Sequence, residues 1–294
     1  MSFIEQIDPV GYSPTEHQVN FALCDMSQGR LASFGGNLIG PHCQYARTLP
    51  ATFSIPPCEG LPDVSNRTQK IITDPCYWTP QLPYLYTFEG EMKLADGSEQ
   101  SWSHTVGFRR WEVEGRNLRL ERRRVVLRGV VVDESSVDLA AAHDAEVTLV
   151  VKEPSNSFLQ QASECGVMVI ADLYNVDTVL TPRLLSLAWH PSVALVLQNE
   201  IYGYLPPALI PGHRVHANAQ LVPESIAHDW ASVILVELNA GERPPAWLAN
   251  TKKPVIVIRR GEDYADFTAA RAACDRLQAE LAPEFDLAGY FVTP

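Results

Sequence analysis

The chain has 294 residues, 46% of them hydrophobic, and a formal net charge of -12. This length and composition indicate a globular protein with one large or two modest domains, and they argue against a disordered or fibrous chain. The negative charge opposes the phosphate backbone of nucleic acids, so we expect no nucleic-acid partner.

No targeting or membrane segment is expected. The first ten residues, MSFIEQIDPV, carry acids and lack the basic-then-apolar order of a signal peptide. No run reaches the roughly eighteen apolar residues of a membrane helix. We therefore expect a cytoplasmic protein without a membrane partner, and the sequence leaves the oligomeric state open.

Cofactor and metal chemistry find no support in the sequence. The six cysteines show no C-x-x-C spacing, and no glycine-rich dinucleotide or phosphate loop occurs. The histidines at 213, 216 and 228 lack the i, i+4 spacing of a helical ligand pair. We expect no metal, no cofactor and no disulfide framework.

Residues 1–110 are expected to be all-β, because short apolar segments are broken by Gly, Pro and Asp at strand-length intervals. Asp96-Gly97 is the strongest hairpin signal in the chain. A small antiparallel sandwich follows as the prediction, with the proline-rich residues 55–62 as a loop on its edge. The expected strands are 19–24, 31–34, 52–55, 69–73, 85–93 and 99–106.

From residue 111 to 294, apolar runs of strand length alternate with longer amphipathic stretches, which predicts repeated βα units. Eight such runs favour a compact (β/α)8 TIM barrel, although about 180 residues is short for one. The fifth run is the weakest. The expected strands are 124–132, 146–151, 167–173, 192–199, 220–222, 232–238, 254–259 and 287–292. The expected helices are 135–143, 155–164, 182–189, 207–217, 245–250 and 264–281.

The fourth run ends in two residues capable of chemistry. Residues 193–197 are continuously apolar, as in a parallel strand covered on both faces, and Asn199 and Glu200 follow. In a parallel barrel such residues lie at the carboxyl edge of the strands, where active sites are built. The alternative interpretation is that Asn199-Glu200 merely caps a loop.

Five motifs occur in order along the chain: TDPCYWTPQLPYLY at 73–86, GFRR at 107–110, LRG at 127–129, HPSV at 190–193 and Asn199-Glu200. Their order and spacing resemble glycoside hydrolase family 2, which includes β-galactosidases, β-glucuronidases and β-mannosidases. The resemblance implies an immunoglobulin-like β-sandwich followed by a (β/α)8 barrel. It also implies a preceding sugar-binding jelly-roll domain, for which we expect no room, so the chain resembles a member truncated at its N-terminus.

The resemblance also implies a retaining mechanism with two carboxyl groups. Glu200 occupies the position of the acid/base, and Asn199 that of a ligand to the sugar 2-hydroxyl. The nucleophile's position, in the frame KPVIVIRRG at 253–261, is occupied by Arg259. A guanidinium cannot act as a carboxylate nucleophile. We therefore expect the site to be degenerate, with Arg259 forming an ion pair with Glu200.

Other sugar-contacting positions depart from the family pattern. Glu153 and Asp172 stand near positions where the family has an Arg with a His-Tyr-Pro-like turn and an Asp-Glu pair, and Thr293 stands where a Trp is usual. Glu153 and Asp172 remain candidate substrate-binding residues, together with Asn199.

Three functions are left open. The first is a catalytically inactive relative, a pseudoenzyme that acts by binding a carbohydrate or another protein. The second is an active O-glycosyl hydrolase that uses Glu200 with a relocated carboxylate, for which Glu237 is the first candidate and Glu153 and Asp172 the next. The third is a protein-interaction scaffold with no sugar site.

Overall fold

The computed structural model describes residues 5–27, 30–59, 67–174, 180–200, 204–216 and 229–294. Contacts between Cα atoms divide the chain into two compact units. The first contains the described part of residues 1–109 together with 180–191 and 204–209, and the second contains the remainder. In the described residues no helix is both long and apolar enough to cross a membrane.

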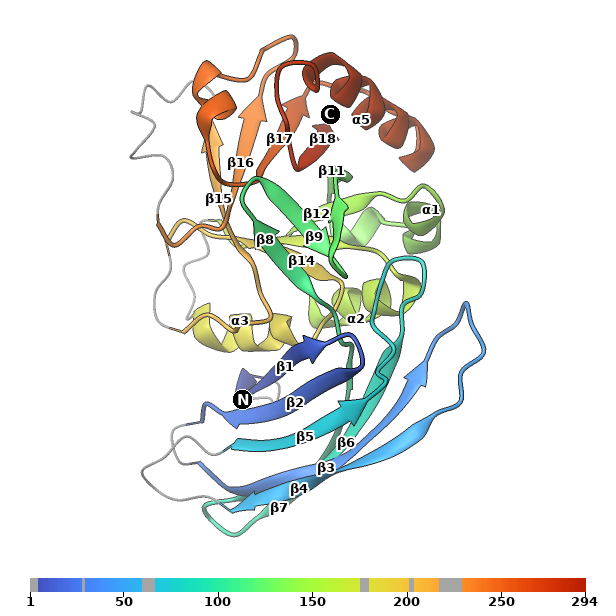
Figure 1. Cartoon of the computed structure of the whole chain (residues 1–294), viewed down its shortest axis with the longest axis vertical. Coiled ribbons are helices and arrows are strands. Elements are labelled where there is room, and N and C mark those ends of the chain that lie inside the picture. The colour runs from blue at the N-terminus through green and yellow to red at the C-terminus, as the bar shows by residue number, and fades with distance from the viewer. Residues whose placement is uncertain (1–4, 28–29, 60–66, 175–179, 201–203, 217–228) are drawn as a thin grey trace. The chain divides into compact units, whose positions relative to one another are not determined.

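The first unit is built from two antiparallel sheets (Figure 1). One has the strand order β1-β2-β5 and the other β4-β3-β6-β7. The strands are β1 (Ile7–Thr15), β2 (Gln18–Asp25), β3 (Leu31–His42), β4 (Ala51–Glu59), β5 (Arg67–Thr73), β6 (Leu85–Leu94) and β7 (Glu99–Val106).

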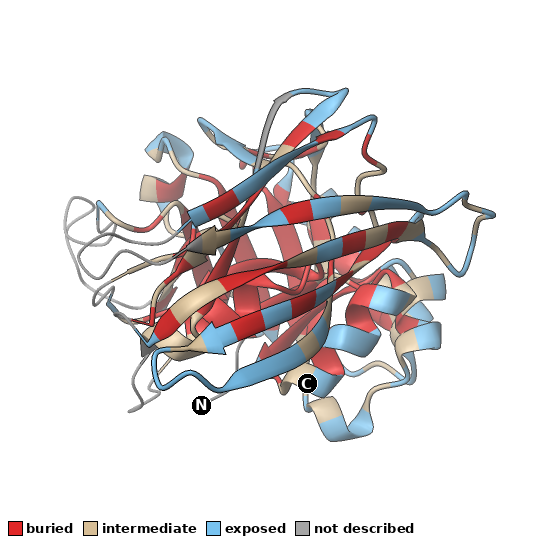
Figure 2. Cartoon of the chain, turned by 90° about the horizontal axis from the view of Figure 1, so that it is seen from below, coloured by how far each residue is buried: buried red, intermediate tan, exposed pale blue. Residues whose placement is uncertain are grey.

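The two sheets pack together through their apolar faces, which alternating hydrophobic residues create. Along β6 the side chains alternate between buried and exposed, and Figure 2 shows the same banding on neighbouring strands. One hydrophobic cluster contains Phe21 of β2, Ile72 of β5, Phe34 of β3 and Phe88 of β6, so the sheets share a core. This arrangement is that of a β-sandwich.

Two sequence predictions for this unit need correction. Strand β1 was not predicted, and it pairs along β2 even though it contains Pro9. Strand β4 continues through Pro56 and Pro57 to Glu59, where a loop was expected from residue 55. Both are edge strands, the place where a sheet tolerates proline. The hairpin at Asp96-Gly97 is confirmed: Gly97 has φ 86° and β6 pairs with β7.

Helix α3 (Leu180–Ala188) and the residues after it belong to the first unit. Trp189 is fully buried, and its indole N–H donates to the carbonyl of Ile7 at 3.1 Å. The Tyr204 hydroxyl donates to the carboxylate of Asp8. Tyr204 therefore packs inside this unit.

Asp8 makes the stability of the first unit pH-dependent. Its side chain is fully buried, and burial raises its pKa to about 6 although the Tyr204 hydrogen bond opposes the shift. The folded state therefore binds the proton more tightly than the unfolded state. The protonated Asp8 carboxyl therefore stabilises the folded state. This stabilisation is complete below about pH 4, the pKa in the unfolded state, and is lost as the pH rises through about 6.

We expect Asp8→Asn to raise the free energy of unfolding by about 3 kcal/mol at pH 7.5 and by only about 1 kcal/mol at pH 4.5. Urea denaturation at the two pH values measures the difference. Glu91→Gln, at an exposed carboxylate of the same unit, is the control. An equal gain at both pH values would contradict the assignment.

The second unit is a closed barrel of eight parallel strands (Figure 1). Its strands are β11 (Leu127–Val132), β12 (Thr148–Lys152), β13 (Val169–Asp172), β14 (Val193–Leu197), β15 (Pro211–His216), β16 (Val233–Leu238), β17 (Val255–Arg260) and β18 (Gly289–Thr293). A small antiparallel sheet precedes them, made of β8 (Trp111–Glu114), β9 (Asn117–Leu120) and β10 (Arg123–Val125). This sheet was not predicted.

The fifth barrel strand was misassigned. We predicted a helix over 207–217 and a strand over 220–222. Residues 211–216 instead form β15, which pairs with β14 and β16, and 220–222 lie outside the described residues. Few described helices accompany the strands, so the unit is only loosely a (β/α)8 barrel.

The described helices of this unit begin and end at recognisable signals. In α2 (Asn156–Cys165) the Ser155 hydroxyl accepts from the Phe158 N–H, and Gly166 ends the helix with φ 74°. In α5 (Phe267–Leu281) the Asp266 carboxylate accepts from the Ala269 N–H. Two 3₁₀ turns, η2 (Glu134–Ser136) and η3 (Ala246–Asn250), and α1 (Leu139–Asp144) complete the unit.

Candidate functional site at the barrel mouth

The interior face of the barrel is defined by one hydrophobic cluster. It draws Ile170 from β13, Leu197 from β14, Leu235 from β16 and Ile258 from β17, among others. Because side chains alternate along a strand, the residue two positions further on lies on the same face. Asp172, Glu237 and Arg260 therefore continue the interior face at the carboxyl ends of their strands.

These residues form a continuous ion-pair network with Arg214 of β15. Arg214 Nη2 lies 2.5 Å from Asp172 Oδ2, and Arg214 Nη1 lies 3.4 Å from Glu237 Oε1. Arg260 Nη2 lies 2.5 Å from Glu237 Oε2. Two carboxylates and two guanidinium groups thus alternate across β13, β15, β16 and β17. We call these four residues the mouth network.

Burial is uneven across the mouth network. The side chains of Asp172, Glu237 and Arg214 are 11%, 7% and 17% exposed, whereas that of Arg260 is 54% exposed. The Arg214 guanidinium also lies over the ring of Tyr174, 5.6 Å from its centroid. Arg260 is therefore the member of the network that presents a cationic group to solvent.

Arg259 lies on the opposite face of β17. Its guanidinium binds the Glu280 carboxylate of α5 in a bidentate manner, with Nη1–Oε2 at 2.5 Å and Nη2–Oε1 at 2.9 Å. Nη2 also donates to the Glu242 carbonyl at 3.3 Å. This ion pair lowers the pKa of Glu280. We expected Arg259 to pair with Glu200 across the mouth, and the structure instead gives it Glu280 as its ion-pair partner.

The other predicted site residues follow the carboxyl ends of β12 and β14. Asn199 is half-buried and Glu200 is exposed after the end of β14. Glu153 is exposed after β12, where its N–H donates to the Asp172 carbonyl at 3.0 Å. Among the predicted residues, Asp172 and Glu237 are joined in one network through Arg214.

The chemistry available to the mouth network is limited by its own pairing. Asp172 and Glu237 each accept hydrogen bonds from a guanidinium, which engages the lone pairs a nucleophile would use. The network is also neutral as a whole, since it contains two acids and two arginines. Within the described residues, no group of three or more His, Cys, Asp or Glu could hold a metal ion.

We expect removal of the Glu237 carboxylate to destabilise the barrel. Glu237→Gln leaves Arg214 and Arg260 without their shared carboxylate, and breaking a largely buried ion pair costs about 3 kcal/mol. Chemical denaturation of the variant measures the loss. Glu112→Gln, at an exposed carboxylate of β8, should change the free energy of unfolding by less than about 0.5 kcal/mol. An unchanged free energy of unfolding in Glu237→Gln would contradict the network.

Two members of the mouth network, Arg214 and Arg260, were missed by sequence reasoning. Arg214 fell inside the wrongly predicted helix over 207–217. Arg260 was visible: counting by twos from Ile256 and Ile258 places it on the interior face. A motif frame identifies a position in the chain, and strand alternation decides which way its side chain points.

Comparisons with known proteins agree on the fold. No protein-family model and no curated protein sequence matches the chain. Among solved structures, β-glucuronidase from Parabacteroides merdae matches with a TM-score of 0.64 at 14% identity, over 99% of this chain and 47% of that one. β-Glucuronidase from Bacteroides uniformis gives 0.66 at 13% identity, over 98% and 45%. A family 2 β-galacturonidase from Eisenbergiella tayi, bound to galacturonate, gives 0.58 at 16% identity, over 98% and 64%.

These likenesses show a glycoside hydrolase-like fold of family 2 type. The chain spans about half the length of the two β-glucuronidases and less than two thirds of the β-galacturonidase. At such low identity the fold is what the chain shares with them.

Proposed function

We propose that this chain is a carbohydrate-binding relative of glycoside hydrolase family 2 that does not hydrolyse glycosides. We also propose that the sandwich before the barrel is immunoglobulin-like and that the active site is degenerate. The observation that carries it is the mouth network, in which Asp172 and Glu237 are held by Arg214 and Arg260.

Double displacement requires a carboxylate that is free to attack the anomeric carbon, about 5 to 5.5 Å from the acid/base. In the family frame the nucleophile's position is Arg259, which cannot attack and which pairs with Glu280 on the outer face. Glu200 keeps the acid/base position without this partner. Both features support loss of the reaction.

A uronic acid is the ligand class that best fits the mouth. Arg260 presents a half-exposed guanidinium there, and guanidinium groups recognise carboxylates by paired hydrogen bonds. The structural neighbours include proteins named as β-glucuronidases and one as a β-galacturonidase bound to galacturonate. Asn199, at the end of β14, is the proposed ligand for a sugar hydroxyl.

Calorimetric titration with methyl β-D-glucuronide and methyl β-D-glucoside tests binding. We expect the glucuronide to bind more tightly than the glucoside, and Asn199→Ala to weaken it about tenfold by removing a ligand hydrogen bond. Asn250→Ala is the matched control, because Asn250 is exposed and precedes β17 at the amino end of the strands. No binding of either sugar would favour an interaction scaffold instead.

The second candidate function is hydrolysis by Glu200 with Glu237 as a relocated carboxylate. The observation that favours it is that Glu237 reaches the interior face at the mouth. Against it, both Glu237 oxygens lie against guanidinium groups. An active enzyme would lose turnover in both Glu200→Gln and Glu237→Gln, which distinguishes it from the proposal.

A further inference from the structure

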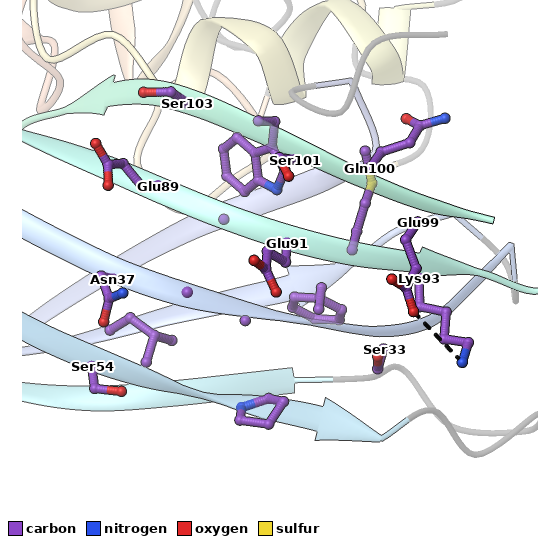
Figure 3. Close-up of a pocket in the computed structure, with 18 residues that line it drawn as sticks. Ser33, Asn37, Ser54, Glu89, Glu91, Lys93, Glu99, Gln100, Ser101 and Ser103 are labelled. Carbon is purple, nitrogen blue, oxygen red and sulfur yellow. Dashed lines mark ion pairs between the residues drawn. The ribbon is translucent and has the colours of Figure 1, made fainter. Parts of the chain in front are cut away.

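The sheet β4-β3-β6-β7 of the first unit carries a hollow on the face turned away from its core. The hollow is open to solvent, has a volume of about 970 Å³ and is lined by residues of all four strands (Figure 3). It lies within one unit and shares no residue with the barrel mouth. It was not anticipated from the sequence.

Glycines and small side chains create the hollow. Gly35 and Gly36 lie at a β-bulge of β3, where Gly36 pairs with Gly90 of β6. A Cβ on Gly36 would lie 2.1 Å from the Glu89 carbonyl oxygen, so no side chain fits there. The backbone therefore forms the floor. Serine side chains on the neighbouring strands project only a short distance above it (Figure 3).

A row of charged side chains runs along β6 above this floor. Glu89, Glu91 and Lys93 occupy alternate positions and are all exposed, so they project from the same face. Lys93 Nζ lies 3.8 Å from Glu99 Oε1 of β7. Within the part of the chain that the structure describes, neither Glu89 nor Glu91 makes an ion pair. Two unneutralised carboxylates thus stand side by side over the hollow (Figure 3).

The cross-strand neighbours of these carboxylates leave them accessible. Glu89 lies between Asn37 of β3 and Ser103 of β7, and Glu91 lies between Gly35 and Ser101. None of these neighbours carries a positive charge or a bulky side chain. The carboxylates are therefore open to a partner from above, with hydroxyl and amide groups beside them as hydrogen-bonding groups.

The spacing of the carboxylates selects the shape of that partner. Residues two apart on a strand are separated by about 6.6 Å, and side chains on one face of an extended peptide repeat at the same interval. A peptide lying along β6 with basic residues at alternate positions would bring one cation to each carboxylate. A single cation would need more ligands than the two glutamates supply, and no metal-binding group is found in the described residues.

We propose that the hollow over Glu89 and Glu91 is a docking site for an extended protein segment with Lys or Arg at alternate positions. Charge complementarity carries the proposal, because the face offers two open carboxylates and the chain as a whole is acidic. The site is independent of any sugar bound in the barrel.

Binding of the dye-labelled peptide acetyl-Ser-Lys-Ser-Lys-Ser-Ser-amide to the full chain, followed by fluorescence anisotropy at low ionic strength, tests this site. We expect Glu89→Gln/Glu91→Gln to weaken binding about fivefold to tenfold, as expected for two exposed ion pairs. The matched control is Glu112→Gln/Glu114→Gln, which removes the same charge from two carboxylates at alternate positions of β8.

A second probe, acetyl-Ser-Lys-Lys-Ser-Ser-Ser-amide, has the same composition but adjacent lysines that face opposite sides of an extended chain. We expect it to bind several-fold more weakly. Equal loss of binding in the two double variants, equal binding of the two peptides, or no binding at all would overturn the proposal. Circular dichroism of each variant confirms that the comparison is between folded proteins.

Discussion

Arg259→Glu should lower the free energy of unfolding by about 4 kcal/mol, because it buries a carboxylate against the carboxylate of Glu280. The Arg259 side chain is 6% exposed and makes a bidentate ion pair with Glu280. Chemical denaturation measures the loss. The same variant should show no glycosidase activity, although it places a carboxylate at the position that resembles the nucleophile's, because the side chain points toward α5.

The charge-reversed double variant Arg259→Glu/Glu280→Arg provides the control. It restores an opposite-charge pair between β17 and α5, so we expect it to recover at least about half of the lost stability. An additive loss in the double variant would show that Arg259 and Glu280 do not interact. Hydrolysis by Arg259→Glu would show that position 259 faces the barrel mouth after all.

Gly129→Ala should destabilise the barrel by at least about 3 kcal/mol, through overpacking of its closed interior. An added Cβ would lie 2.1 Å from the Thr148 carbonyl oxygen and 2.3 Å from the Phe291 ring. The first of these contacts is with backbone and cannot be relieved by a rotamer change. Thermal or chemical denaturation would measure the effect.

Gly11→Ala is the matched control for this glycine. An added Cβ there would meet Phe108 at 3.7 Å, which is an ordinary contact distance. We expect a change in the free energy of unfolding below about 1 kcal/mol. An equally small change in the free energy of unfolding for Gly129→Ala would contradict the close approach of β11, β12 and β18 at this point.

The parts of the fold that could be predicted are those in which local pattern and tertiary role agree. The apolar run Val193–Leu197 is buried along its whole length as β14. The apolar stripe of α5, including Ala270, Cys274 and Leu277, faces inward as its helical spacing predicts. In each case the residues that define the pattern are also the residues that the fold buries.

The elements that could not be predicted carry polar or imino residues for tertiary reasons. β15 has the sequence PGHRVH, with Arg214 on the interior side because Asp172 and Glu237 bind it. Such a strand lacks the apolar run that marked its neighbours. β1 contains Pro9, and its position at a sheet edge makes that residue acceptable.

The candidate site also contains residues that could be predicted from the sequence and residues that could not. Asp172 and Glu237 could be found from their positions at strand ends, which parallel barrels use for their sites. The distinction between Arg259 and Arg260 depends on the face of β17 from which each side chain projects. The motif frame named Arg259, whereas the mouth network contains Arg260. The partners of both arginines come from segments distant in the sequence.

Single-turnover release of nitrophenolate is the most direct test of a carbohydrate-binding protein without glycosidase chemistry. Wild-type chain at stoichiometric or higher concentration is mixed with p-nitrophenyl β-D-glucuronide and followed by absorbance over many hours. We expect no release above buffer and an identical trace for Glu200→Gln. Release by the wild type that disappears in Glu200→Gln would contradict it.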